Sequence, residues 1–147
     1  MKAMIIISVT LLIFSCSDKN VHKNILVFEL RLAETESAPD LQEMTFLQTG
    51  QNFYIHDSVF ISNSDLLSAA VIDRQTQPKV KVRLTEQGRK KFAEFTLNHI
   101  GKNAAMIVDN KLVSAPRINA QITQGIFLIV GLFNEEEAQT IADGIVP

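Results

Sequence analysis

The 147-residue sequence has no tryptophan, only one cysteine and no surplus of positive charge. A lone cysteine excludes a disulfide framework within the chain. Lysine and arginine number 14 against 16 aspartates and glutamates, which gives a formal net charge of −2. Because a protein that binds nucleic acid needs a clustered excess of basic residues to neutralise phosphates, this balance argues against a nucleic-acid partner.

The patterns that usually mark catalytic or metal sites are missing as well. The three histidines, His22, His56 and His99, are scattered, and none stands at metal-ligand spacing from another histidine or from Cys16. There is no glycine-rich phosphate-binding loop, and Ser114 lacks the flanking glycines of a nucleophile elbow. The sequence therefore predicts no cofactor, no metal, no small-molecule substrate and no catalytic activity.

Two features that contain acidic residues were considered as possible catalytic or metal-binding sites. His56 is followed by Asp57, and an adjacent aspartate can orient a histidine for general-base catalysis, although such pairs are far more often surface features. A small hydrolase centred on this pair is the weakest of three functional hypotheses. The run Glu135, Glu136 and Glu137 is not a metal site, because consecutive residues of a helix point in different directions.

The one long apolar run, MIIISVTLLIF, follows the first three residues. It is too short to span a bilayer and is typical of the hydrophobic region of a signal peptide. The run ends in Ile13, Phe14, Ser15 and Cys16, an order that resembles a bacterial lipobox, in which the cysteine receives lipid and becomes the mature N-terminus. We therefore expect a lipoprotein signal peptide over residues 1–15 and lipidation of Cys16. The alternative is an ordinary cleaved leader with an incidental cysteine.

Lipidation would hold the protein in the bacterial cell envelope, facing the periplasm, with the membrane as its first partner. Residues 16–23 are short, polar and mixed in charge, as expected of a tether. The remaining residues, 24–147, are enough for a single core, so one domain is predicted there.

The first half of that domain is predicted to consist mainly of strands. Residues 24–33 alternate between apolar and polar side chains, and residues 53–61 indicate two short strands kinked at the His56–Asp57 pair. Asn63 is expected to cap a short helix over residues 64–70, because its side chain can accept hydrogen bonds from the first free backbone amides.

Residues 85–116 carry the clearest local pattern. Thr85 is placed to cap a helix, with Glu86 in the first turn, and Gly101 is a typical residue for the helix end. The apolar stripe predicted to face the core comprises Gly88, Phe92, Ala93, Thr96, Leu97 and Ile100. On the opposite side, residues 89–91 are a basic run expected to face water.

A hairpin is predicted directly after this helix. Residues 104–108 form a short apolar strand, Asp109 and Asn110 suit a two-residue turn, and residues 111–114 return as the partner. Pro116 cannot donate to a strand ladder and ends the second strand.

The C-terminal part predicts two strands and a helix. Residues 117–124 indicate an irregular edge strand, and residues 126–130, IFLIV, form the most hydrophobic strand of the domain and so its expected centre. Phe133 is expected to pack on Ala138, and Asn134 to cap a helix with Glu137 three residues later. Its buried stripe comprises Ala138, Ile141, Ala142 and Ile145. Together with an alternating strand over residues 80–84, these elements predict an α+β domain, a mostly antiparallel sheet with two main helices packed on one face.

Several of these motifs resemble one known family. They are the helix end with Thr96, Asn98 and Gly101, the segment AAMIVDNKLVSAP, the positions Ile118, Ile122 and Gly125, and the closing IVGLFNEEEAQTIADGI. Together they are similar to the head subdomain of the first periplasmic region of SecD, a protein-export membrane subunit. The resemblance covers roughly the last half of the chain. Asn110 stands where that family favours glycine, and asparagine also tolerates the turn conformation.

The resemblance implies a SecD-head-like fold and a non-catalytic binding or accessory role, in contact with preproteins or with translocon subunits. No apolar run of membrane-spanning length follows the leader, so the implied function is limited to the head's part, which is binding. Exposed sheet edges suit such a role, because they offer backbone groups to an extended peptide. The alternative is an envelope lipoprotein that reuses the fold to bind an unrelated partner.

Overall fold

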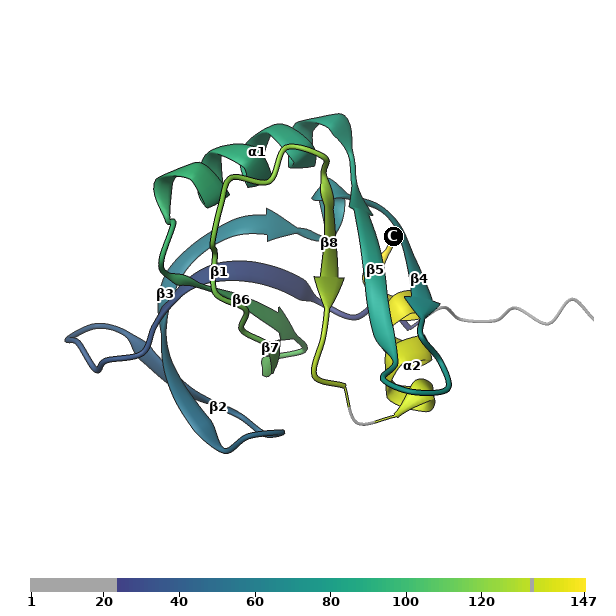
Figure 1. Ribbon diagram of the computed structural model, residues 1–147, viewed down its shortest axis with the longest axis horizontal. Helices are drawn as coiled ribbons and strands as arrows, with labels where there is room; N and C mark the ends of the chain where they lie inside the picture. The colour runs from purple at the N-terminus through teal and green to yellow at the C-terminus, as the bar shows by residue number, and fades with distance from the viewer. Residues whose placement is uncertain (1–23, 133) are drawn as a thin grey trace, which may run out of the picture.

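The computed structural model describes residues 24–132 and 134–147 (Figure 1). Within them the chain forms eight strands, two α-helices and one short 3₁₀ helix. The predicted signal peptide, Cys16, the tether, His22 and the staple residue Phe133 lie outside the described residues.

Five antiparallel strands form the larger sheet, in the order β2-β3-β1-β6-β7. They are β1 (Phe28–Glu34), β2 (Gln42–Phe46), β3 (Gln51–Ser62), β6 (Asn103–Val108) and β7 (Lys111–Ser114). The sheet curls so strongly that its two outer strands, β2 and β7, come into contact. A small core that includes Phe53, Ile55 and Ile107 fills the space enclosed by the curl.

Three antiparallel strands form the smaller sheet, in the order β4-β5-β8. They are β4 (Leu66–Ile72), β5 (Lys79–Leu84) and β8 (Ile126–Ile129). The alternation predicted for residues 80–84 is confirmed, because Val80, Val82 and Leu84 are buried while Lys81 and Arg83 are exposed.

The two helices pack at different ends of the domain (Figure 1). Helix α1 (Glu86–Asn98) contacts β3 and β5, and α2 (Glu135–Ile145) contacts β4 and β5. Both predicted caps are confirmed: the hydroxyl of Thr85 accepts from the amide of Gly88 at 3.0 Å, and the side chain of Asn134 accepts from the amide of Glu137 at 2.8 Å.

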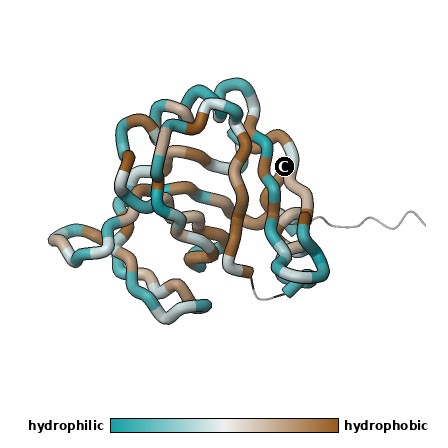
Figure 2. The backbone as a smooth tube through the Cα atoms, in the orientation of Figure 1, coloured by the Kyte–Doolittle hydropathy of each residue, from teal (hydrophilic) through white to brown (hydrophobic). Residues whose placement is uncertain are grey.

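The main core lies between the two sheets and beneath both helices. The ring of Phe127 is 5.8 Å from that of Phe28 and 5.5 Å from that of Phe92, so β8, β1 and α1 meet through aromatic contacts. Figure 2 shows the same division, with hydrophobic chain running through the centre and along β8, and hydrophilic chain on the outside of α1 and at the turn between β4 and β5.

The α+β class with mostly antiparallel strands and two main helices is confirmed, but the strands form two sheets instead of one. Strand β1 is hydrogen-bonded to β3 and β6, and β5 is hydrogen-bonded to β4 and β8. Both sides of these central strands are therefore occupied, and the two sheets meet through apolar side chains.

The predicted central position of residues 126–130 is wrong, because β8 is an edge strand of the smaller sheet. Its hydrophobicity has another cause. Phe127 and Ile129 point into the main core, whereas Leu128 on the outer face is 37% exposed. An edge strand can therefore be apolar on both faces, with one face in the core and the other partly exposed.

The helix predicted over residues 64–70 is also wrong: only Asn63–Asp65 form a 3₁₀ turn, and β4 follows. The side chain of Asn63 is used for other contacts. It accepts from the amide of Phe28 at 2.9 Å and donates to the carbonyls of Leu26 at 2.8 Å and Ile145 at 2.7 Å. Pairing of the following residues with β5 then favours a strand over a helix.

Two further strand predictions need correction. Residues 51–62 form one continuous strand and not two. Its pairing with β1 shifts register on both sides of Arg31, so the strand is irregular near His56, as expected, but is not interrupted there. Residues 117–124 form no strand, and only an isolated bridge joins Arg117 to Asn103.

The buried stripe of α1 differs in part from the prediction. Phe92 and Thr96 are buried as expected, but Leu97 is 52% and Ile100 53% exposed, and Phe95 is buried in their place. Gly88 permits the closest approach, since a Cβ there would lie 2.6 Å from the carbonyl oxygen of Asp65. The buried face of the helix is therefore rotated about its axis relative to the predicted stripe, toward Phe95.

The predicted hairpin and helix end are confirmed. Asp109 and Asn110 have φ of 45° and 61°, as a two-residue turn between β6 and β7 requires, and Gly101 has φ of 89° just past α1. The buried stripe predicted for α2 is confirmed as well, since Ala138, Ile141, Ala142 and Ile145 are all buried.

Candidate binding edge and groove

Strand β8 has a free edge. Its partner β5 lies on one side, where the amide of Leu84 donates to the carbonyl of Gly125 at 2.9 Å. Because hydrogen-bonded pairs alternate along an antiparallel ladder, the backbone groups of Phe127 and Ile129 point toward β5. Those of Ile126 and Leu128 point away from it, and among the described strands none lies on that side. Four backbone donors and acceptors are thus available to an added strand.

An apolar groove of about 500 Å³ lies beside this edge. Four elements line it: α1, β6, β8 and the connection between β7 and β8. Its apolar lining includes Phe92, Met106, Ile118, Ile122 and Phe127, and Ile126 and Leu128 border it along β8. The groove therefore joins unpaired backbone groups to a hydrophobic surface.

The connection between β7 and β8 forms one wall of the groove, and hydrogen bonds fix its position. Figure 1 shows it rising beside α1 before the chain descends as β8. The carbonyl of Ile118 accepts from the amide of Gly101 at 2.7 Å, and its amide donates to the carbonyl of Lys102 at 2.8 Å. The wall is therefore attached to the end of α1 and the start of β6.

Thr96 holds the other end of this wall. Its hydroxyl is buried, donates to the carbonyl of Phe92 at 2.9 Å and accepts from the amide of Ile122 at 2.9 Å. The sequence predicted Thr96 only as part of a buried stripe. Its role as the link between α1 and the groove wall depends on a residue 26 positions away, which no local pattern indicates.

His56 and Asp57 do not form the predicted pair. The nearest polar partner of the His56 ring is Glu34, with Nε2 to Oε1 at 3.4 Å, and no described hydrogen bond joins His56 to Asp57. The arrangement that motivated the hydrolase hypothesis is therefore not formed.

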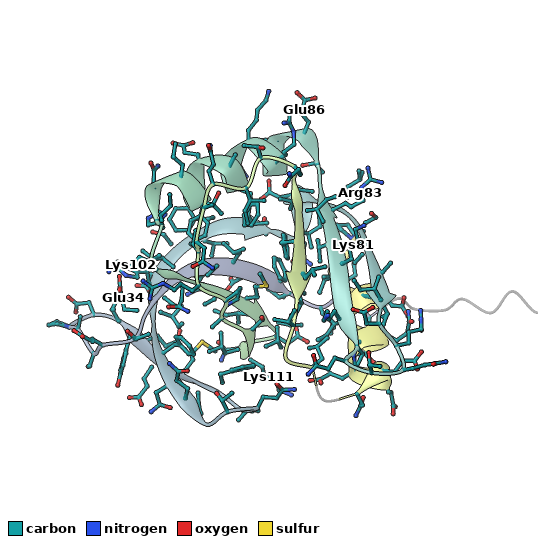
Figure 3. The ribbon with its side chains drawn as sticks, in the orientation of Figure 1. Glu34, Lys81, Arg83, Glu86, Lys102 and Lys111 are labelled. Carbon is teal, nitrogen blue, oxygen red and sulfur yellow. The ribbon has the colours of Figure 1, made fainter. Side chains whose placement is uncertain are left out.

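Glu34 is the centre of a small charged cluster at the end of β1. Its carboxylate accepts from Nζ of Lys102 at 2.7 Å, and Figure 3 shows these two side chains meeting beside the end of α1. The hydrogen bond from Lys102, and to a lesser degree that from His56, lowers the pKa of Glu34 despite partial burial, which acts in the opposite direction. The cluster borders a polar recess of about 260 Å³.

The other residues considered as candidates lie apart from one another and contact neighbouring parts of the fold. The ring of His99 is hydrogen-bonded through Nδ1 to the carbonyl of Phe95 at 2.8 Å and meets the ring of Phe60 edge-on. Ser114 is buried at the end of β7. Glu135 forms an ion pair with Arg74 at 2.6 Å. Within residues 24–132 and 134–147 no three histidine, cysteine or acidic side chains gather as metal ligands do.

Sequence reasoning missed one buried charge. Asp65 is 3% exposed, and its carboxylate accepts from Nζ of Lys91 at 2.8 Å and from the amide of Ser62 at 3.1 Å. Lys91 was predicted only as part of a solvated basic face. The pair joins the 3₁₀ turn to α1 across 26 positions of sequence, and spacing alone does not indicate it.

The family model described as the SecDF P1 head subdomain matches residues 36–145. The chain belongs to this family. The match includes the middle of the chain, whereas the resemblance seen in the sequence motifs covered roughly the last half. Within the described part of the chain, neither helix is long and apolar enough to cross a membrane.

Individual relatives agree with the family. The chain is 42% identical over 86 residues to the protein translocase subunit SecD of Leptotrichia buccalis, covering 58% of this chain and 21% of that protein. It is 41% identical over 83 residues to the protein translocase subunit SecDF of Thermus thermophilus, covering 56% and 11%. The chain thus spans about a fifth or less of the length of these relatives.

Solved structures show the same fold. SecDF in a super-membrane-facing form superposes with a TM-score of 0.68 at 26% identity, over 84% of this chain and 19% of that one. A structure described as a membrane component SecDF that enhances protein export gives a TM-score of 0.68 at 25% identity, over 84% and 63%. The SecD-head-like fold predicted from the motifs is therefore confirmed.

Proposed function

We propose that this P1-head domain is a non-catalytic part of the protein-export machinery that binds extended segments of preproteins along the free edge of β8. The main support for the proposal is the position of that edge beside the groove. Strand β8 offers unpaired backbone groups directly beside an apolar groove of about 500 Å³.

An extended chain is the partner that matches both features. Added beside β8, it would pair with the outward backbone groups of Ile126 and Leu128, and such bonds do not depend on the partner's side chains. Successive side chains of a strand point to opposite faces, so every second one would enter the groove. Varied unfolded chains with some apolar residues could therefore bind at one site, as preprotein contact requires.

The family supports the export context. The curated relatives are named as protein translocase subunits, and one structural neighbour is described as enhancing protein export. The whole activity of those longer proteins is not implied, because this chain matches only their head.

We further propose that Cys16 is lipidated, that residues 16–23 tether the domain, and that it faces the periplasm. The support is the apolar leader that ends at the only cysteine. Cys16→Ala should move the full-length protein from the membrane fraction to the soluble fraction of lysed cells. A variant that still fractionates with membranes would contradict lipid anchoring at this residue and leave the binding role untouched.

Site-specific photocrosslinking in cells tests the binding role. A photoreactive residue in place of Leu128, at the free edge, is compared with one in place of Leu47, which is 66% exposed and does not line the groove. We expect many different exported chains attached at position 128 and far fewer at position 47. One recurrent envelope protein at position 128 would instead support the unrelated-partner alternative.

A backbone variant separates strand addition from simple apolar contact. Proline at position 128 removes a donor that points away from β5, so the ladder with β5 is kept. Leu128→Ala removes the same side chain but leaves that donor. Strand addition predicts that Leu128→Pro loses most crosslinking, measured from the neighbouring position 126, while Leu128→Ala retains most of it. Equal loss in both variants would contradict pairing through the backbone.

A further inference from the structure

The outer face of the smaller sheet carries two basic side chains beside the proposed binding edge. In the register of β5 and β8, Arg83 lies opposite Ile126 and Lys81 lies opposite Leu128. All four point away from the main core, because the alternate residues Val80, Val82, Phe127 and Ile129 are buried. Figure 3 shows Lys81 and Arg83 extending outward from β5.

Neither charge is neutralised within the described chain. Nearby acidic groups are already paired: Asp73 binds Lys79 at 2.9 Å, and Glu86 binds Lys90 at 3.3 Å. No carboxylate of residues 24–132 or 134–147 lies within ion-pair distance of Lys81 or Arg83. The face is therefore locally positive on a protein whose formal net charge is −2.

We infer that Lys81 and Arg83 give the binding edge a preference for extended segments in which acidic residues alternate with apolar ones. This inference rests on the strand addition proposed above. In an added strand, the side chains that do not enter the groove lie in the same cross-strand rows as Leu128–Lys81 and Ile126–Arg83. Acidic side chains in those rows would face two unpaired cations.

The distances permit this contact. An added strand would lie two strand spacings, about 9.5 Å, from β5. Lysine and arginine extend their aliphatic stems over apolar neighbours while the charged ends stay in water. Leu128 and Ile126 are such neighbours, so the ends of Lys81 and Arg83 can approach a glutamate on the added strand. A basic residue at the same place would be repelled.

Peptide binding to the full-length protein in an uncharged detergent tests the inference. Four nine-residue fluorescent peptides are compared by anisotropy: alternating valine with glutamine, with glutamate or with lysine, and a glutamate peptide whose valines are grouped together. We expect the alternating glutamate peptide to bind about fivefold more tightly than the glutamine peptide, and the lysine peptide more weakly than both. The preference should shrink as salt is raised, because the charges are exposed.

A double variant, Lys81→Glu with Arg83→Glu, should reverse the order of the glutamate and lysine peptides. The matched control, Lys90→Glu with Lys111→Glu, changes the net charge by the same amount away from the groove and should keep the original order. An equal shift in both double variants would overturn the inference, because net charge would then explain the preference.

The outcomes also separate this inference from the proposed function. If no alternating peptide binds, strand addition itself fails. If the glutamine and glutamate peptides bind equally, only the charge preference fails. If the peptides show no preference but Lys81→Glu with Arg83→Glu reduces binding to vesicles that contain phosphatidylglycerol, the basic face contacts an anionic lipid surface, and the inference is wrong.

Discussion

The five-stranded sheet curls until its outer strands β2 and β7 touch, whereas the three-stranded sheet leaves β8 without a neighbour on one side. An open edge is a risk for any soluble domain, because unpaired backbone groups recruit other chains. In the larger sheet β2 and β7 are not paired with each other, but the curl brings these two edge strands into contact. In the smaller sheet the edge of β8 lies next to an apolar groove instead, and the proposed binding site lies on that side of the molecule.

The two sheets are nevertheless connected near the groove. The chain after β8 contacts the turn of the larger sheet, where Nε2 of Gln48 donates to the carbonyl of Leu132 at 2.9 Å. Gly131 permits this contact, since a Cβ there would lie 2.5 Å from the ring of Phe46. The larger sheet thus helps to position the chain just after β8.

The largest effect should come from the shared core beneath the groove. Phe92 is 2% exposed and contacts the ring of Phe127 on β8. Phe92→Ala should lower the free energy of unfolding by about 3–5 kcal/mol, measured by urea denaturation, because it leaves a cavity. Leu97→Ala on the same helix, at a position 52% exposed, should cost less than about 1 kcal/mol. A loss below about 1 kcal/mol for Phe92→Ala would show that α1 is not a rigid support for the open edge.

A smaller effect is expected from the groove wall. Thr96→Val removes the hydroxyl that accepts from the amide of Ile122, and leaving this partly buried amide without a partner should cost about 1 kcal/mol or somewhat more. Amide hydrogen exchange at Ile122 should accelerate. Thr140→Val is the control, because the hydroxyl of Thr140 bonds only to the carbonyl of Glu136 on an exposed surface. Unchanged exchange at Ile122 would mean that the wall is held by its other contacts.

The pair of Lys91 and Asp65 tests how the 3₁₀ turn before β4 is joined to α1. Lys91→Met should destabilise the protein by about 1 kcal/mol, because it leaves a nearly buried carboxylate with one hydrogen-bond partner fewer. Lys90→Met breaks only an exposed pair with Glu86 and should have an effect near zero in the same thermal melt. Similar melting temperatures for both variants would show that Asp65 is satisfied without Lys91.

Helix caps and the tight turn were predicted correctly from local patterns. The caps at Thr85 and Asn134 and the turn at Asp109 depend on residues at most three positions apart, and each is present. The wrong helix over residues 64–70 concerns a partner that is distant in sequence. Strand β4 forms where a helix was expected, because β5 supplies its hydrogen bonds.

Some features of the candidate site could also be predicted from the sequence, and others could not. The hydrophobicity of β8 was visible in the sequence, but its place at an edge depends on which strands occupy the other positions of the sheet. The outward positions of Lys81 and Arg83 follow from the alternation around Val82, yet their relation to Leu128 and Ile126 exists only in the register of two strands about 45 residues apart.

The smallest predicted effect concerns the larger sheet. Lys102 lowers the pKa of Glu34 in the folded protein, so the ionised carboxylate stabilises the fold at every pH above its unfolded pKa, near 4.5. That stabilisation is lost as the pH falls through the lowered folded pKa. Because Lys102 is half exposed, the contribution should be less than about 1 kcal/mol. Glu34→Gln should reduce the difference in unfolding free energy between neutral and acidic pH, measured by urea denaturation, whereas Glu94→Gln on exposed α1 should not. An unchanged pH dependence in Glu34→Gln would mean that the larger sheet draws no measurable stability from this cluster.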